Sequence, residues 1–119
     1  MRYMSRYGSS PRGSMIRSTV RETGHNTWEG VFFFHPDDGI YRDHFPGYPV
    51  VPGSLIVHAF LKAADEAGIP EEYATIENFR FREFLSPGHY TYRIERRNDR
   101  LSCLIYQDNR KLVTGVVRR

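Results

Sequence analysis

The stretch "HFPGYPVVPGSLIVHA", residues 44–59, decides the fold of this chain and carries its candidate chemistry. It turns at two Pro-Gly pairs, where glycine suits the positive φ of a type II turn. It then runs into "SLIVHAFLKAADEA", residues 54–67, which lack Pro and Gly and are rich in alanine and leucine. The pattern predicts a helix over 54–67 that is stopped by Gly68 and Pro70.

The apolar side chains of the predicted helix go nearly all the way round it. A helix of this kind is buried on most sides, so we expect the rest of the chain to wrap it. A spacing of three or four residues leaves one polar line, made of Ser54, His58, Lys62 and Asp65. This line is either an ordinary solvent-facing stripe or the lining of a wet cleft.

Strands are predicted on both sides of the helix. Two are expected before it, over 15–22 and 27–35, and four antiparallel strands after it, over 74–85, 89–97, 101–107 and 111–117. We therefore expect one α+β domain over 15–119, in which a curled antiparallel sheet surrounds a central helix. Residues 1–14 are rich in Ser, Gly and Arg and are expected to form a flexible arm.

Composition excludes several functional classes. The length of 119 residues suits one domain, and no apolar run approaches the roughly 18 residues of a membrane span. The absence of a signal-peptide pattern favours a cytoplasmic protein. The net charge is +3, but the arginines are spread out without a nucleic-acid motif, so no nucleic acid is expected as a partner. Some of them would meet an acidic partner or form a solvated face: Arg80, Arg82, Arg96, Arg97 and Arg100.

The predicted helix start offers backbone donors. With Pro52 at the first turn, the amides of Gly53, Ser54 and Leu55 are expected to be unpaired at the positive end of the helix dipole. Gly53 lets a ligand approach its backbone closely, and a thioester carbonyl placed there would be polarised. His44, at the mouth of the loop, is a candidate general base. The plainer interpretation is a helix start without a ligand and an exposed histidine.

These residues resemble the hotdog-fold 3-hydroxyacyl-(acyl-carrier-protein) dehydratases of fatty-acid synthesis. The shared pattern is His-Phe-Pro-Gly, any residue, Pro, two apolar residues and Pro-Gly, which runs here from His44 to Gly53. "FRFREFLSPGHYTYRI", residues 79–94, is similar to the strand, Pro-Gly and strand that follow in the family. The resemblance implies a hotdog fold that works as a homodimer or as a larger oligomer built from it.

The resemblance also implies an activity. The substrate is a 3-hydroxyacyl thioester on an acyl carrier protein or coenzyme A, and loss of water gives a 2-enoyl thioester for fatty-acid, polyketide or related lipid synthesis. In this family pattern His44 removes the proton next to the carbonyl, and the amides of Gly53 and Ser54 hold the carbonyl oxygen. A carboxylic acid on the helix of the neighbouring subunit protonates the departing hydroxyl. No metal and no cofactor are expected.

The chain departs from the family where the helix acid belongs, because that position is His58. A histidine donates a proton only as an imidazolium, which burial disfavours. Three outcomes stay open: His58 is the acid, another group such as Asp65 or Glu66 substitutes, or the protein binds acyl groups without dehydrating them. The alternatives to a dehydratase are therefore a non-catalytic acyl-binding or partner hotdog subunit, and a hotdog thioesterase.

Overall fold

A single antiparallel sheet packs against one helix in the computed structural model, which describes residues 16–37, 49–70, 73 and 75–119. The helix is α2, Gly53–Glu66. The strands are β1 Ile16–Ser18, β2 Arg21–Gly24, β3 Thr27–Phe34, β4 Thr75–Phe81, β5 Gly88–Arg97, β6 Arg100–Gln107 and β7 Arg110–Arg118. The expected arm, residues 1–14, lies outside the described residues.

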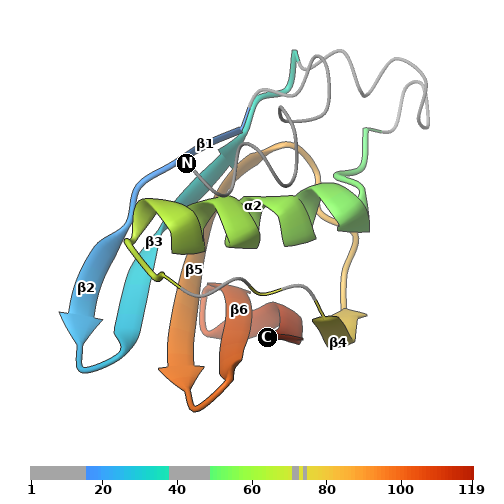
Figure 1. The fold of residues 1–119 in the computed structure, drawn as a ribbon. Coiled ribbons are helices and arrows are strands. Elements are labelled where there is room, and N and C mark those ends of the chain that lie inside the picture. The colour runs from blue at the N-terminus through green and yellow to red at the C-terminus, as the bar shows by residue number, and fades with distance from the viewer. Residues whose placement is uncertain (1–15, 38–48, 71–72, 74) are drawn as a thin grey trace.

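The strands follow the order β1-β3-β5-β6-β7-β4, and β2 also pairs with β3. Every pairing is antiparallel. Helix α2 lies across one face of this curved sheet, with its axis crossing the strands (Figure 1). The predicted α+β architecture, an antiparallel sheet around one helix, is confirmed. No helix in the described parts of the chain is long and apolar enough to cross a membrane.

Three aromatic rings hold the helix on the sheet. Phe32 of β3 and Tyr92 of β5 stack with ring centroids 4.0 Å apart, and Phe60 of α2 meets the Phe32 ring edge-on at 5.1 Å. All three side chains are fully buried. The Tyr92 hydroxyl donates a hydrogen bond of 2.7 Å to the carbonyl oxygen of Thr19, so the polar end of this buried ring is satisfied.

The strand predicted over 15–22 is wrong as a single element, because the chain breaks into β1 and β2 at Thr19. The Thr19 amide donates to the Val31 carbonyl at 3.1 Å, and its own carbonyl accepts from the buried tyrosine hydroxyl. The close approach requires Gly30, where a Cβ atom would lie 1.9 Å from the Thr19 oxygen. The two strands therefore pair with opposite ends of β3.

Strand β4 contains a bulge, which explains why its sequence alternates imperfectly. The register shifts within the strand, so that Ile76 lies opposite Val117 and Phe81 lies opposite Val113. Both valines are buried in the core. An extra residue in a strand reverses the alternation beyond it. Ile76 and Phe81 therefore lie on the helix side of β4 although five positions separate them.

Helix α2 ends as the sequence predicts. The Gly68 amide donates to the Asp65 carbonyl at 3.0 Å, and the Ile69 amide donates to the Ala64 carbonyl at 3.1 Å. These are the two hydrogen bonds of a Schellman motif, which needs a residue of positive φ after the helix. Gly68 provides it, with φ +81°. The helix predicted over 54–67 is confirmed to within one residue at each end.

The sheet buries one side of α2 only. The buried positions share the face toward the sheet, and they are Leu55, Ile56, Ala59, Phe60, Ala63 and Ala64. Val57 and Leu61 are half-buried on the other side, as are His58 and Lys62. Only Ser54 and Glu66 of α2 are exposed, so most of the helix surface is covered, as the sequence predicts.

Replacing Gly115 by alanine is expected to destabilise the fold. A Cβ atom there would lie 2.4 Å from two ring atoms of Phe79, which rests on β7 at this point. Overpacking of this kind costs about 1–3 kcal/mol in the free energy of unfolding, which urea denaturation measures. Gly24→Ala is the control, because its nearest neighbour would be 3.9 Å away. Equal stability of Gly115→Ala and the unmodified protein would contradict the close packing.

Candidate active site at the start of the helix

The start of α2 carries free backbone donors. Its N-cap is Pro52, which provides no side-chain cap. The Pro52 carbonyl accepts hydrogen bonds from the amides of Leu55 at 3.0 Å and Ile56 at 3.2 Å. The Leu55 amide is therefore paired, and its prediction as a free donor is wrong. The amides of Gly53 and Ser54 have no acceptor among the described residues, which leaves two donors at the positive end of the helix dipole.

Backbone hydrogen bonds fix the surroundings of this helix start. The Val51 amide, just before the helix, donates to the Leu85 carbonyl at 2.7 Å. Leu85 belongs to the connection between β4 and β5. At the beginning of that connection the Arg82 amide donates to the Leu112 carbonyl of β7 at 2.8 Å. The segment that follows β4 is therefore tied both to the sheet and to the residue that leads into the helix.

Phe81 touches the helix start, which the sequence did not predict. A Cβ atom built on Gly53 would lie 3.0 Å from the Cζ atom of the Phe81 ring. Phe81 as a whole residue is 42% exposed. Sequence analysis places Phe81 only within the predicted strand over 74–85, and nothing in a local pattern indicates that this strand meets residue 53. The contact depends on the order of strands in the sheet, which places β4 at its edge.

His58 lies one turn and a half further along the same helix, about 7.5 Å from Gly53 along the axis at the usual rise per residue. The imidazole is half-buried. Burial lowers the pKa of His58 below its ordinary value of 6.5, and the positive charge of Lys62 on the next turn lowers it further. The ring is therefore mainly neutral at neutral pH. The polar line of the helix is exposed at Ser54 and half-buried at His58, Lys62 and Asp65.

The structure thus brings three of the four predicted site residues onto one helix. Gly53 and Ser54 begin it, and His58 follows on its partly uncovered side. The fourth, His44, lies outside the described residues, so its role stays a prediction. In the described parts of the chain no three His, Cys, Asp or Glu side chains are grouped so that they could hold a metal ion.

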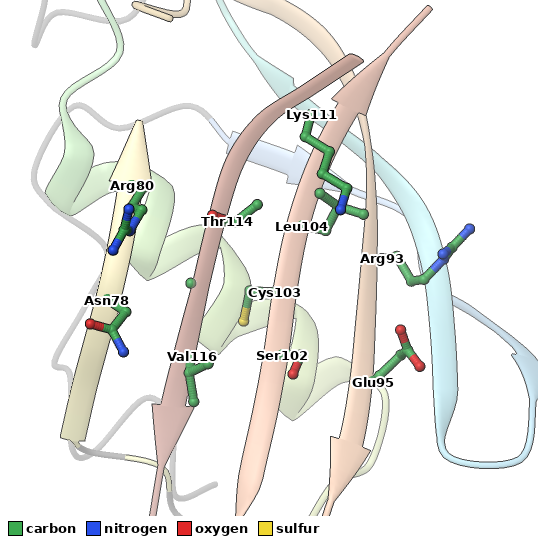
Figure 2. Close-up of a pocket in the computed structure, with 11 residues that line it drawn as sticks. Asn78, Arg80, Arg93, Glu95, Ser102, Cys103, Leu104, Lys111, Thr114 and Val116 are labelled. Atoms are coloured by element: carbon green, nitrogen blue, oxygen red, sulfur yellow. The ribbon is translucent and has the colours of Figure 1, made fainter. Parts of the chain in front are cut away.

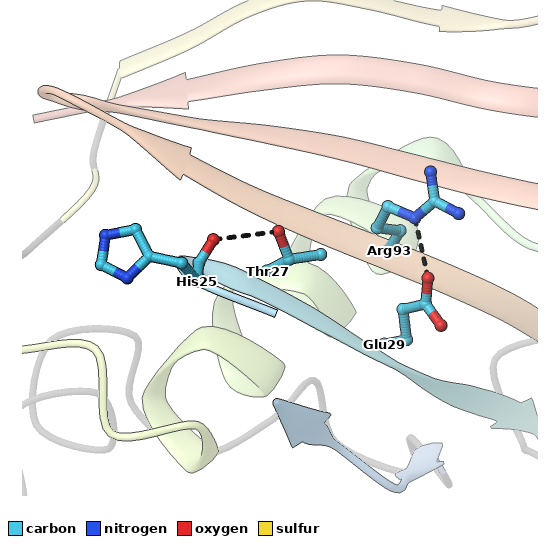
Figure 3. Close-up of polar contacts among 4 residues, drawn as sticks. All are labelled: His25, Thr27, Glu29 and Arg93. Carbon is cyan, nitrogen blue, oxygen red and sulfur yellow. Dashed lines mark hydrogen bonds and ion pairs between the residues drawn. The ribbon is translucent and has the colours of Figure 1, made fainter. Parts of the chain in front are cut away.

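A separate groove lies on the opposite face of the sheet. Its volume is about 460 Å³, and its lining includes Arg80, Arg93 and Lys111. Figure 2 shows these side chains on the side of the strands that faces away from α2. Arg93 forms an ion pair with Glu29, with Nε 2.9 Å from Oε2 (Figure 3). This groove is separated from the helix start by the whole sheet and takes no part in the candidate site.

The family model described as ApeI-like, ApeI dehydratase, matches residues 20–116. The chain belongs to the ApeI-like dehydratase family. A similar curated protein is the 3-hydroxyacyl-[acyl-carrier-protein] dehydratase FabZ of Halalkalibacterium halodurans, 37% identical over 60 residues, which are 44% of this chain and 43% of that protein. The FabZ of Acetivibrio thermocellus is 36% identical over 67 residues, 50% of this chain and 45% of that one. The matches span less than half the length of these relatives.

Solved structures confirm the predicted hotdog fold of this ApeI-like chain. The dehydratase heterocomplex ApeI:P from Xenorhabdus doucetiae superposes with a TM-score of 0.74 at 18% identity, over 84% of this chain and 92% of that one. A putative thioesterase from Ralstonia eutropha superposes with a TM-score of 0.58 at 15% identity, over 84% and 81%. At these identities the likeness concerns the fold alone.

We expect the stability of this chain to fall as His58 is forced to take a proton. Because folding lowers the pKa of His58, the unfolded chain binds the proton more readily. The stabilising effect of a neutral His58 is therefore present above its ordinary pKa of 6.5 and is lost as pH falls through that value toward the lower folded pKa. NMR titration of the imidazole measures the pKa directly. Between about pH 8 and about pH 5, the free energy of unfolding measured with urea should fall less steeply in His58→Gln than in the unmodified protein.

His25→Gln is the matched control, because the His25 side chain is exposed. It should leave the pH dependence of unfolding unchanged. A folded-state pKa of His58 at or above 6.5 would contradict the electrostatic argument.

Proposed function

We propose that this chain is a dehydratase that removes water from a 3-hydroxyacyl thioester and leaves a 2-enoyl thioester. The observation that supports this most is the pair of free amides at Gly53 and Ser54, at the start of the helix of an ApeI-like chain. Abstraction of the C2 proton moves negative charge onto the thioester oxygen. Preorganised backbone donors stabilise that charge, and one such donor is worth about 3 kcal/mol in other enzymes.

His44 is the proposed base. It heads the His-Phe-Pro-Gly stretch that leads to Gly53, and a neutral imidazole accepts a proton near neutral pH. His44 alone can carry out both proton transfers of the reaction. His44 takes the C2 proton and becomes an imidazolium, the enolate electron pair forms the C2–C3 double bond, and the C3–O bond breaks. Return of the proton from His44 to the departing oxygen gives water and restores the base.

His58 is proposed to orient the departing hydroxyl. Its lowered pKa makes the neutral ring the main form, and a neutral imidazole both accepts and donates a hydrogen bond. It lies on the partly uncovered side of α2, where a neighbouring subunit or an acyl chain has access. An acid role would need the minor, protonated form, which both burial and Lys62 disfavour.

An acidic acyl carrier protein is the proposed source of the substrate. The FabZ relatives are named as acyl-carrier-protein dehydratases. In this chain the exposed Arg82 directly follows Phe81, which contacts the helix start. Cations at the mouth of a site attract an acidic partner and raise its rate of association. Coenzyme A thioesters share the same reacting group, and they are the alternative donor in a cytoplasmic setting.

A homodimer through β4 is the proposed assembly. Strand β4 is the last strand in the sheet order, so one of its edges is unpaired within the described residues. Ile76 on its helix side is 53% exposed, and Val57 and Leu61 of α2 are only half-buried. A second copy would extend the sheet and cover this apolar surface.

Purified protein is expected to convert a 3-hydroxyacyl thioester into a conjugated enoyl thioester, followed by its ultraviolet absorbance. His44→Ala should lower kcat about 10²- to 10⁴-fold, the usual contribution of a general base. His25→Ala, in which an exposed histidine is removed, should keep the rate. Equal rates of His44→Ala and the unmodified enzyme would remove His44 from the mechanism. Release of free thiol without enoyl product would identify a thioesterase instead.

A second candidate is a partner subunit that binds acyl groups and relies on another hotdog chain for its acid. It is favoured by the histidine at position 58 and by the structural neighbour described as a heterocomplex. Light scattering should show a homodimer of the purified chain, and that dimer should be active. His58→Glu, which restores a carboxylic acid, should then raise its rate. A monomer without activity, rescued only by a second hotdog chain, would support the partner subunit.

A further inference from the structure

We propose that Phe81 is a positioning residue of this site and selects thioesters without a branch at C2. The inference rests on the proposed function, because it concerns the pocket in which the thioester carbonyl meets the helix start. In this proposal the Phe81 ring forms one wall of that pocket. The ring belongs to the edge strand β4 and not to the loop or the helix.

The wall lies beside the free amides. A Cβ atom on Gly53 would be 3.0 Å from the Cζ atom of the Phe81 ring, 3.3 Å from Cε2 and 3.5 Å from Cε1. The tip of the ring therefore occupies the space of the missing Gly53 side chain. In an α-helix the Cα–Cβ bond tilts toward the N-terminus. The ring consequently lies next to the donors that open the helix and not over its later turns.

The surrounding hydrogen bonds hold the backbone next to Phe81 in place. The residue after Phe81 donates its amide to the Leu112 carbonyl at 2.8 Å, and the Leu85 carbonyl accepts from the Val51 amide at 2.7 Å. An ion pair between Glu83 and Arg110 ties down the segment between these two bonds. On its inner side the Phe81 ring packs against Phe79 with centroids 6.2 Å apart. These contacts fix the backbone on both sides of Phe81, so its ring can leave the helix start only by a change of side-chain rotamer.

The ring nevertheless keeps an open face, since Phe81 is 42% exposed. A carbonyl oxygen held by the Gly53 amide lies about 2.9 Å from its nitrogen, so the carbonyl carbon and C2 come into van der Waals range of groups beside the Gly53 Cα. The aromatic edge is therefore the neighbour of C2. It excludes water from one side of the oxyanion contact, which strengthens that contact. It also leaves little room for a methyl group on C2.

The kinetic test compares two 3-hydroxyacyl thioesters that differ only by a C2 methyl group. Phe81→Ala should lower kcat on the unbranched substrate about tenfold or more while KM changes little, because water then reaches the oxyanion contact. The ratio of kcat/KM for the branched over the unbranched substrate should rise about 10- to 200-fold, the usual discrimination for one methyl or methylene group. For Phe81→Leu, both kcat on the unbranched substrate and the substrate ratio should lie between the values of the unmodified protein and of Phe81→Ala.

Ile76→Ala is the matched control. Ile76 lies on the same strand and the same face as Phe81 and is similarly exposed, at 53%, but it pairs with Val117 at the far end of β4. Its removal should leave the ratio of kcat/KM for the two substrates unchanged. A loss of activity that followed from a weakened β4 edge would appear in both variants.

A stability cycle tests the contact without any activity. Gly53→Ala should lower Tm in the unmodified protein, because its methyl group meets the Phe81 ring, and should no longer do so in the Phe81→Ala background. Additive changes in Tm would overturn the contact and the proposal with it. An active enzyme whose kcat and substrate ratio do not change in Phe81→Ala would overturn the role of Phe81 alone. An inactive unmodified protein would overturn the proposed dehydratase and, with it, this role.

Discussion

The packing of Phe60 against Phe32 and Tyr92 is the contact on which the site depends. It places α2 across the middle strands of the sheet at a fixed height and angle. Once the helix lies there, its first turn reaches the end of β4, where Phe81 meets Gly53. Loss of the ring contact would let the helix slide along the sheet, and the donors at its start would lose their surroundings before any site residue had changed.

The free donors at the helix start result from an N-cap residue, Pro52, whose side chain cannot accept a hydrogen bond from the first amides of the helix. Serine, threonine, aspartate and asparagine at an N-cap pair their side chain with the first amides of the helix. Pro52 cannot do so, and its carbonyl reaches only the amides of the third and fourth helical residues. The two amides before them stay available to a ligand. A free donor pair at the helix start provides a place where developing negative charge is stabilised.

The sequence predicted those elements that depend only on residues close to one another along the chain. The helix end at Gly68 and the hairpin at Asp108 and Asn109 follow from residues that tolerate positive φ, and the structure gives φ +81°, +52° and +63° there. The break at Thr19 and the wall at Phe81 were not predictable in this way. Each depends on a partner 73 or 28 residues away, Tyr92 in one case and Gly53 in the other. Such contacts appear only when the strand order is known.

This chain has His58 where the resemblance places a carboxylic acid, and burial affects these two groups in opposite ways. A carboxylic acid is neutral while it holds its proton, so burial raises its pKa and keeps it ready to donate. An imidazolium is charged while it holds its proton, so the same burial lowers the pKa of His58 and removes the proton before it is needed. Lys62 acts in the same direction. A pocket that keeps a carboxyl group protonated therefore makes a histidine a neutral hydrogen-bonding group, and in the proposed mechanism the departing hydroxyl takes its proton from the base.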